Sequence, residues 1–135
     1  EEKVKTRFEF VSEEERILHY GASDMVVCPS LYEPCSIISL EAMAMEKPVI
    51  LGSKCIRDSC DHVNLSGHEQ TGIHVNGSDL IDIACGINTL LEDMEGAREM
   101  GKRGRKRLKK YSKWDKIIEY TIGIYEDVIR EVGKK

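Results

Sequence analysis

A short apolar run that passes through a loop into a helix constrains this chain more than any other feature. Residues 25–28 are apolar and partly β-branched, which is typical of a buried parallel strand. Pro29 and Pro34 then favour a loop, and Ser36 is a good N-cap for a helix over 37–45. We therefore expect a strand, a loop and a helix in that order, the unit from which parallel α/β sheets are built.

Glu33 and Glu41 stand eight positions apart around the predicted start of this helix. The first N–H groups of a helix have no partner within it, and the helix dipole favours an anion there. Glu41 follows Ile37 by one turn, about 6 Å along the axis, and Glu33 lies outside the carboxyl end of the strand, where open α/β sheets bind ligands. This layout suits a phosphorylated sugar. The alternative is that Glu33 is a solvated loop acid and Glu41 an ordinary exposed helix residue.

Residues 29–44 have the sequence Pro-Ser-Leu-Tyr-Glu-Pro-Cys-Ser-Ile-Ile-Ser-Leu-Glu-Ala-Met-Ala. This segment resembles the donor-site signature of retaining nucleotide-sugar glycosyltransferases of GT-B fold, which include glycogen, starch and sucrose-phosphate synthases and many mannosyl- and glucosyltransferases. The likeness continues, in the family's order and spacing, through residues 22–27, 47–50, 71–75 and 111–114. The resemblance therefore covers nearly the whole chain.

The resemblance implies a role for each matched residue. Glu33 would be the catalytic residue that contacts hydroxyls of the donor sugar, and Glu41 would bind the ribose hydroxyls of the nucleotide. The backbone N–H groups of Ser36, Ile37 and Ile38 would hold the distal phosphate. The family needs no protein nucleophile, metal ion or further cofactor, because the leaving diphosphate helps to deprotonate the acceptor hydroxyl while the protein stabilises the charge on that diphosphate.

The sequence departs from the family pattern at several positions. Glu46 stands where the family has the glycine that ends the helix, a position suited to left-handed backbone, so it implies a different exit or some strain. Ser36 replaces a glycine, and a Gly-Gly pair near the donor is reduced to the single Gly52. Lys54 or Arg57 is a candidate for supplying positive charge to the phosphates from this altered loop. These changes bear on donor specificity and turnover.

The expected fold class is α/β, a Rossmann-like parallel sheet with helices on both faces and a helical C-terminal part. We predict a single partial donor-binding domain over 1–135, with about four strands at 4–10, 25–28, 48–51 and 72–75. By the resemblance these are the third to sixth strands, so the first two strands and the N-terminal acceptor domain are missing. In the usual strand order, 3-2-1-4-5-6, the strand at 4–10 would not touch the strand at 25–28.

Three explanations of the missing strands stay open. The chain is a piece of a longer protein, or its sheet is rearranged, or a partner fills the gap; the exposed sheet edge would also suit a dimer. Under each of them we expect the 135-residue chain alone not to transfer sugar.

Three helices are predicted in the C-terminal half. Asp79 caps the first, over 80–91, and helices at 95–111 and 113–132 follow. Apolar residues at helical spacing predict a buried stripe on each helix, and we expect Trp114 and Tyr125 of the last helix to lie in the local core rather than on a partner. The other inward positions are Ile83, Ile87, Leu90 or Leu91, Ala97, Met100, Gly101, Gly104, Leu108 and Tyr111, and on the last helix Ile117, Ile118, Ile122, Val128 and Ile129.

Residues 98–113 carry nine Lys or Arg and one acid. The cations from Lys102 to Lys110 would bind an anionic membrane surface, nucleic acid, or only solvent as a charged helix face. The net charge of −4 gives the whole chain no pull towards nucleic acid, so no specific nucleic-acid partner is expected. No apolar run approaches the ~20 residues of a membrane span, so we expect a cytoplasmic protein, with a peripheral membrane position as the alternative.

Five cysteines, an odd number without framework spacing, predict free thiols in a reducing compartment. Cys55, Cys60, His62 and His68 match no standard zinc pattern, so no metal site is expected. Cys35 lies in the proposed donor loop, where the neighbouring acids would raise the pKa of its thiol and disfavour a role as nucleophile.

Two classes of function therefore remain. The first, which we adopt, is the donor-binding half of a retaining hexosyltransferase, whose partners are a nucleotide sugar and an acceptor domain. The alternative is a non-catalytic regulatory or interaction module that kept the fold, including an anionic-surface binder that works through the basic helix 98–113.

Overall fold

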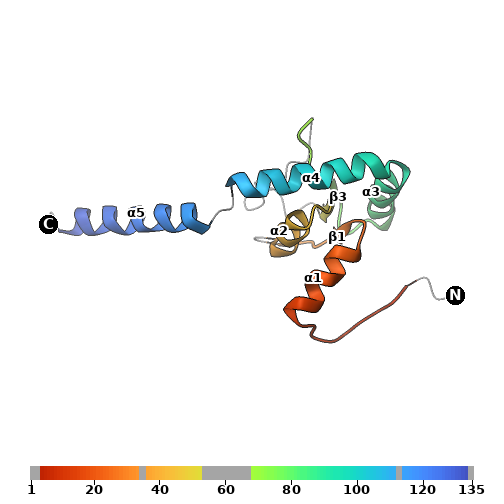
Figure 1. Cartoon of the computed structure of the whole chain (residues 1–135), viewed down its shortest axis with the longest axis horizontal. Helices are drawn as coiled ribbons and strands as arrows, with labels where there is room; N and C mark the ends of the chain where they lie inside the picture. The colour runs from red at the N-terminus through yellow and green to blue at the C-terminus, as the bar shows by residue number, and fades with distance from the viewer. Residues whose placement is uncertain (1–3, 34–35, 53–67, 112–113, 134–135) are drawn as a thin grey trace.

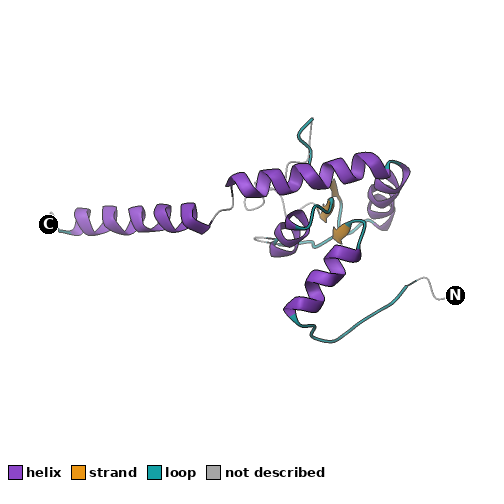
Figure 2. Ribbon diagram, in the orientation of Figure 1, coloured by secondary structure: helices purple, strands orange, loops and turns teal. Residues whose placement is uncertain are grey.

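The computed structural model describes residues 4–33, 36–52, 68–111 and 114–133. The chain forms five helices and three strands in this part (Figures 1 and 2). In chain order they are α1 (Glu13–Ala22), β1 (Val26–Cys28), α2 (Ile37–Ala44), β2 (Val49–Gly52), β3 (Gly72–Val75), α3 (Leu80–Glu92), α4 (Met94–Tyr111) and α5 (Trp114–Val132).

The three strands form a parallel sheet in the order β1-β2-β3. Because successive side chains of a strand point to opposite faces, the apolar strands supply two separate core clusters. One face carries Cys28, Val49 and Leu51, which pack against Ala42 and Met43 of α2. The other face carries Ile50 and Val75, which pack against α3 and α4 through a second set of buried residues, Leu90, Ala97 and Met100. The predicted fold class, an α/β parallel sheet with helices on both faces, is confirmed.

The strand predicted at 4–10 is not formed. This segment runs as a loop away from the sheet (Figure 1), and its side chains Phe8 and Phe10 are fully exposed. A strand exists only by pairing its backbone groups with a neighbour, and no described strand lies beside this one. The described sheet therefore has three strands where about four were predicted.

Helix α1, which the sequence interpretation does not contain, precedes β1. Its N-cap is Ser12, whose Oγ accepts a hydrogen bond from the backbone N–H of Glu15 at 3.2 Å. Glu13, Glu14 and Glu15 fill the first turn, where the helix dipole favours acidic side chains. The signal was present in the sequence, since Ser12 and Glu15 have the spacing of a capping box.

The end of α2 resolves the question raised by Glu46. The N–H of Lys47 donates to the carbonyl of Ala42 at 2.9 Å and the N–H of Glu46 donates to the carbonyl of Met43 at 3.1 Å. These are the two bonds of a Schellman motif, and Glu46 occupies its left-handed position with φ 59°. The helix therefore ends in the usual way, and a residue with a Cβ bears the strain that a glycine would avoid.

Helix α4 lies against this end of α2. A Cβ added to Gly101 would overlap the backbone carbonyl of Glu46, and a Cβ on Gly104 would press on the side chain of Met43 at 3.2 Å. The two glycines therefore let the helix backbones approach closely. The predicted stripe of α4 is confirmed where it is described, with Ala97, Met100, Gly101 and Gly104 buried.

The last helix forms as predicted, but the prediction that it packs into the local core is wrong. Helix α5 projects away from the body of the molecule (Figure 1), and none of its residues is buried. Trp114 and Tyr125 are 76% and 66% exposed instead of lying in the local core. The apolar periodicity correctly predicted an amphipathic helix, but periodicity carries no information about what covers the apolar stripe. None of the described helices combines the length and apolar character needed to cross a bilayer.

Substituting Gly101 by Ala tests the approach of α4 to α2. The added Cβ would collide with backbone, so we expect a loss of about 1–3 kcal/mol in the free energy of unfolding. The control is Gly123→Ala on α5, where a Cβ would meet nothing within 4 Å and should stabilise the helix by up to about 1 kcal/mol. Equal effects of the two changes in urea denaturation would contradict the contact.

Substituting Glu46 by Gly tests the strain at the end of α2. Glycine adopts left-handed backbone without strain, so the free energy of unfolding should rise by a net of roughly 0.5–1 kcal/mol. This net value already includes the loss of the exposed ion pair with Arg105. The matched variant Glu46→Ala loses the same ion pair but keeps the Cβ, so it should show no gain. Thermal denaturation of both variants measures the difference.

Candidate functional site

The carboxyl ends of the three strands converge on the loop that follows β1. A Cβ on Gly52, at the end of β2, would overlap the backbone carbonyl of Ser30. A Cβ on Gly77, just after β3, would overlap the carbonyl of Pro29. Pro29 and Ser30, at the beginning of this loop, therefore lie directly against the ends of the neighbouring strands.

Ser36 caps α2 as predicted. Its side chain is buried, its Oγ accepts from the N–H of Ser39 at 3.3 Å, and the hydroxyl of Ser39 donates to the carbonyl of Ser36 at 2.6 Å. Among the described residues no acceptor meets the N–H groups of Ile37 and Ile38, and both side chains are exposed. The start of α2 thus presents fixed N–H donors at the positive end of a helix dipole, an arrangement that suits an anion.

Glu41 lies one turn further along α2, and two residues of α1 contact its carboxylate. The hydroxyl of Tyr20 donates to Oε2 at 2.9 Å, and the guanidinium of Arg16 lies 3.1 Å from Oε1. Each carboxylate oxygen therefore has one partner from α1. A carboxylate offers about four acceptor positions, so the contacts orient Glu41 and leave it capacity for further donors.

Glu33 is half-buried in the loop between β1 and α2. In the part of the chain that the structure describes, Glu33 and Glu41 share no hydrogen-bond or ion-pair partner. The structure brings Ser36, Ile37 and Ile38 together at one helix start, with Glu41 above them on α2 and Glu33 before them in the chain.

Arg16 and Tyr20 are the site residues that sequence reasoning missed. They are four positions apart on α1 and so lie on one face of that helix. The capping signal at Ser12 could have revealed the helix, but nothing local indicates that its face meets Glu41.

Several other sequence predictions fall outside the described residues. Lys54, Arg57 and Cys35 lie there, as do Cys55, Cys60 and His62 of the cluster that was judged unsuited to zinc. Within the described ranges no group of three or more His, Cys, Asp or Glu side chains could hold a metal ion.

The phenol of Tyr20 provides a pH test of this arrangement. Burial, then the hydrogen bond to Glu41, raises its pKa from 10 to about 12. Because the folded-state pKa is the higher one, the contribution of this proton to stability is complete below pH 10 and is lost as the pH rises through about 12. The ultraviolet titration of the wild type minus that of Tyr20→Phe should show one phenol with its midpoint near 12.

The variant Glu41→Gln is the control for this titration. It removes the charge but not the burial, which is the larger cause, so the midpoint should fall only part of the way towards 10. A wild-type midpoint at the ordinary value would show that Tyr20 does not lie against Glu41.

The chain is similar to known glycosyltransferases over most of its length. It is 35% identical over 117 residues to an uncharacterized glycosyltransferase of Methanocaldococcus jannaschii, covering 85% of this chain and 28% of that protein. It is 33% identical over 112 residues to the α-maltose-1-phosphate synthase of Mycolicibacterium smegmatis, covering 80% of this chain and 28% of the synthase. The chain therefore spans a little more than a quarter of the length of these relatives.

The fold is similar to that of a solved sucrose-phosphate synthase from Thermosynechococcus elongatus. The two superpose with a TM-score of 0.76 at 29% identity, over 90% of this chain and 29% of the synthase. The α/β fold of this chain thus matches part of a GT-B enzyme.

The family model for glycosyl transferases group 1 matches residues 3–107. This match covers well over half of the chain. The chain therefore belongs to the group 1 glycosyltransferase family.

Proposed function

We propose that this chain is the donor-binding part of a retaining glycosyltransferase. It binds a nucleoside diphosphate sugar, and the hexose of that sugar nucleotide is transferred to an acceptor hydroxyl. The observation that carries the proposal is the start of α2. There the N–H donors of Ile37 and Ile38 stand one helical turn from an oriented carboxylate, Glu41. A diphosphate needs N–H donors and a ribose needs a hydrogen-bond acceptor, and a nucleoside diphosphate carries both groups a few ångströms apart.

Each residue has one task in this proposal. The N–H groups of Ser36, Ile37 and Ile38 bind the distal phosphate, and the carboxylate of Glu41 accepts from the ribose hydroxyls. Glu33 accepts from hydroxyls of the donor sugar. As the bond from the sugar to the diphosphate breaks, negative charge grows on the phosphate oxygen. Donors that are already in place stabilise this charge without reorganisation, and such stabilisation commonly contributes more to catalysis than any other single effect.

The contacts from α1 support the role of Glu41. Arg16 places a positive charge beside one carboxylate oxygen, and Tyr20 holds the other. Both contacts fix the orientation of the group before a ligand arrives, which reduces the entropy lost on binding. The names of two relatives, α-maltose-1-phosphate synthase and sucrose-phosphate synthase, support a hexosyl group as the one transferred.

Calorimetric titration of the chain with UDP, GDP and ADP tests the proposal. We expect one of the three nucleotides to bind. Glu41→Ala should weaken its binding by about 1.5–3 kcal/mol, or roughly ten- to a hundredfold in affinity, because charged hydrogen bonds to the ribose are lost. The control is Glu119→Ala, which removes an exposed acid from α5 and should leave the affinity unchanged.

Two results would count against the proposal. Binding that Glu41→Ala does not weaken would remove the ribose role of Glu41. Binding of none of the three nucleotides would favour the alternative, a non-catalytic module that kept the fold.

A further inference from the structure

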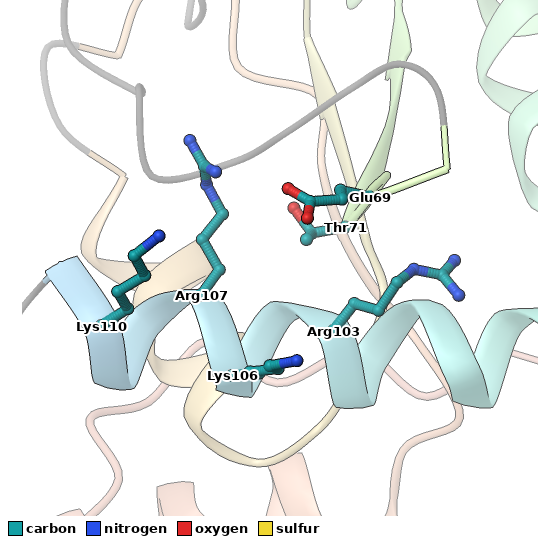
Figure 3. A pocket seen from close by; sticks show the side chains of 6 residues that line it. All are labelled: Glu69, Thr71, Arg103, Lys106, Arg107 and Lys110. Atoms are coloured by element: carbon teal, nitrogen blue, oxygen red, sulfur yellow. The ribbon is translucent and has the colours of Figure 1, made fainter.

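A second candidate site lies at the opposite edge of the sheet from the start of α2. The strands are parallel, so the residue that precedes β3, Thr71, lies at the amino edge, whereas Ser36 follows the carboxyl end of β1. Here α4 and the segment that leads into β3 enclose a pocket of about 280 Å³ (Figure 3). We call it the α4 pocket; its lining residues are Glu69, Thr71, Arg103, Lys106, Arg107 and Lys110.

Among the described residues, four cations and one carboxylate line this pocket. The cations are at positions 103, 106, 107 and 110, a spacing that puts all of them on one side of α4. Figure 3 shows them along the helix, with Glu69 and Thr71 on the facing wall. Like charges four residues apart destabilise a helix, and the pairs Arg103 with Arg107 and Lys106 with Lys110 both have this spacing. The helix therefore concentrates like charge here at a cost in stability.

Two cations of α4 that do not line the pocket form ion pairs. Lys102 pairs with Glu99 at 2.6 Å and Arg105 pairs with Glu46 at 3.4 Å. Within the described ranges Lys106 has no such ion pair. The lining of the pocket, as far as the structure describes it, brings four cations together with one acid.

Helix α4, which carries these cations, is closely packed. Gly101 and Gly104 hold α4 against α2, and Thr71 is buried. The Nε of Arg103 donates to the carbonyl of Gln70 at 2.9 Å, which orients its guanidinium. A donor that is already oriented loses little freedom on binding, so Arg103 favours affinity for a small anion.

We propose that the α4 pocket binds a phosphomonoester. Such a group carries about two negative charges at neutral pH, and its oxygens match both the planar fork of arginine and the point charge of lysine. The volume lies just below the roughly 300–1,000 Å³ of sites for drug-sized molecules, so the ligand is small. The phosphomonoester is either a free metabolite or the headgroup of a lipid, and the recognition chemistry is the same for both. The inference does not depend on the nucleotide site, which lies at the other edge of the sheet.

Titration of the ¹⁵N-labelled chain with methyl phosphate, followed by amide chemical shifts, tests the proposal. We expect saturable shifts in residues 70–72 and 103–110. The double variant Lys106→Gln/Lys110→Gln should weaken binding at least tenfold. The matched variant Arg98→Gln/Lys109→Gln removes the same charge from positions of α4 outside the pocket. It should leave the affinity within about twofold of the wild-type value, because salt screens charges that lie far from the ligand.

Vesicle flotation distinguishes the two sources of the phosphomonoester. Phosphatidylcholine vesicles are compared with vesicles that also contain phosphatidic acid or phosphatidylserine. Binding to methyl phosphate shows that a soluble phosphomonoester is sufficient to occupy the pocket. Binding to phosphatidic acid alone, lost only in the pocket variant, identifies a lipid headgroup.

Other outcomes overturn the inference. These are shifts that do not saturate, shifts confined to Ile37 and Ile38, absence of binding to every probe, and equal losses in the two double variants. If the two double variants lost binding to phosphatidylserine vesicles equally, the basic residues would act as a diffuse charged face of α4 rather than as a pocket. Unchanged amide shifts elsewhere in each variant establish that it is folded.

Discussion

The close approach of α4 to the end of α2 governs the arrangement of both candidate sites. Gly101 lies against the carbonyl of Glu46, and this contact is available only because Glu46 adopts left-handed backbone and Gly101 has no side chain. Met43 is buried between the two helices and the sheet. One end of this packed unit is therefore the start of α2, with its N–H donors, and the other carries the cations of α4.

The two edges of the sheet present positive charge in different ways. At the carboxyl edge the donors are backbone N–H groups, whose directions the helix determines, and the acid Glu41 is held by Arg16 and Tyr20. At the amino edge the donors are long side chains of α4. The first arrangement suits a ligand that also needs a hydrogen-bond acceptor, such as a ribose, and the second suits a compact anion.

Elements with strong local signals were predicted well. The caps at Ser36 and Asp79 are formed, and β3 covers the predicted residues, because caps and short apolar runs act within a few positions of the chain. The segment 4–10 has the apolar content of a strand but lies exposed, since a strand also needs a neighbour. Helix α5 formed with its apolar stripe uncovered for a related reason: periodicity determines a helix, not its partner.

By itself the sequence determined the fold class, the order of the elements from β1 to α5, the start of α2 and the resemblance to glycosyltransferases. These follow from residue types at short spacing and from a matching motif. Only the tertiary structure decided that Tyr20 donates to Glu41, 21 positions away. The same holds for the pocket that Arg103, Lys106, Arg107 and Lys110 of α4 line together with Glu69 and Thr71. Contacts between distant positions depend on how helices cross the sheet, and that crossing is set by packing of the whole core, which no local pattern encodes.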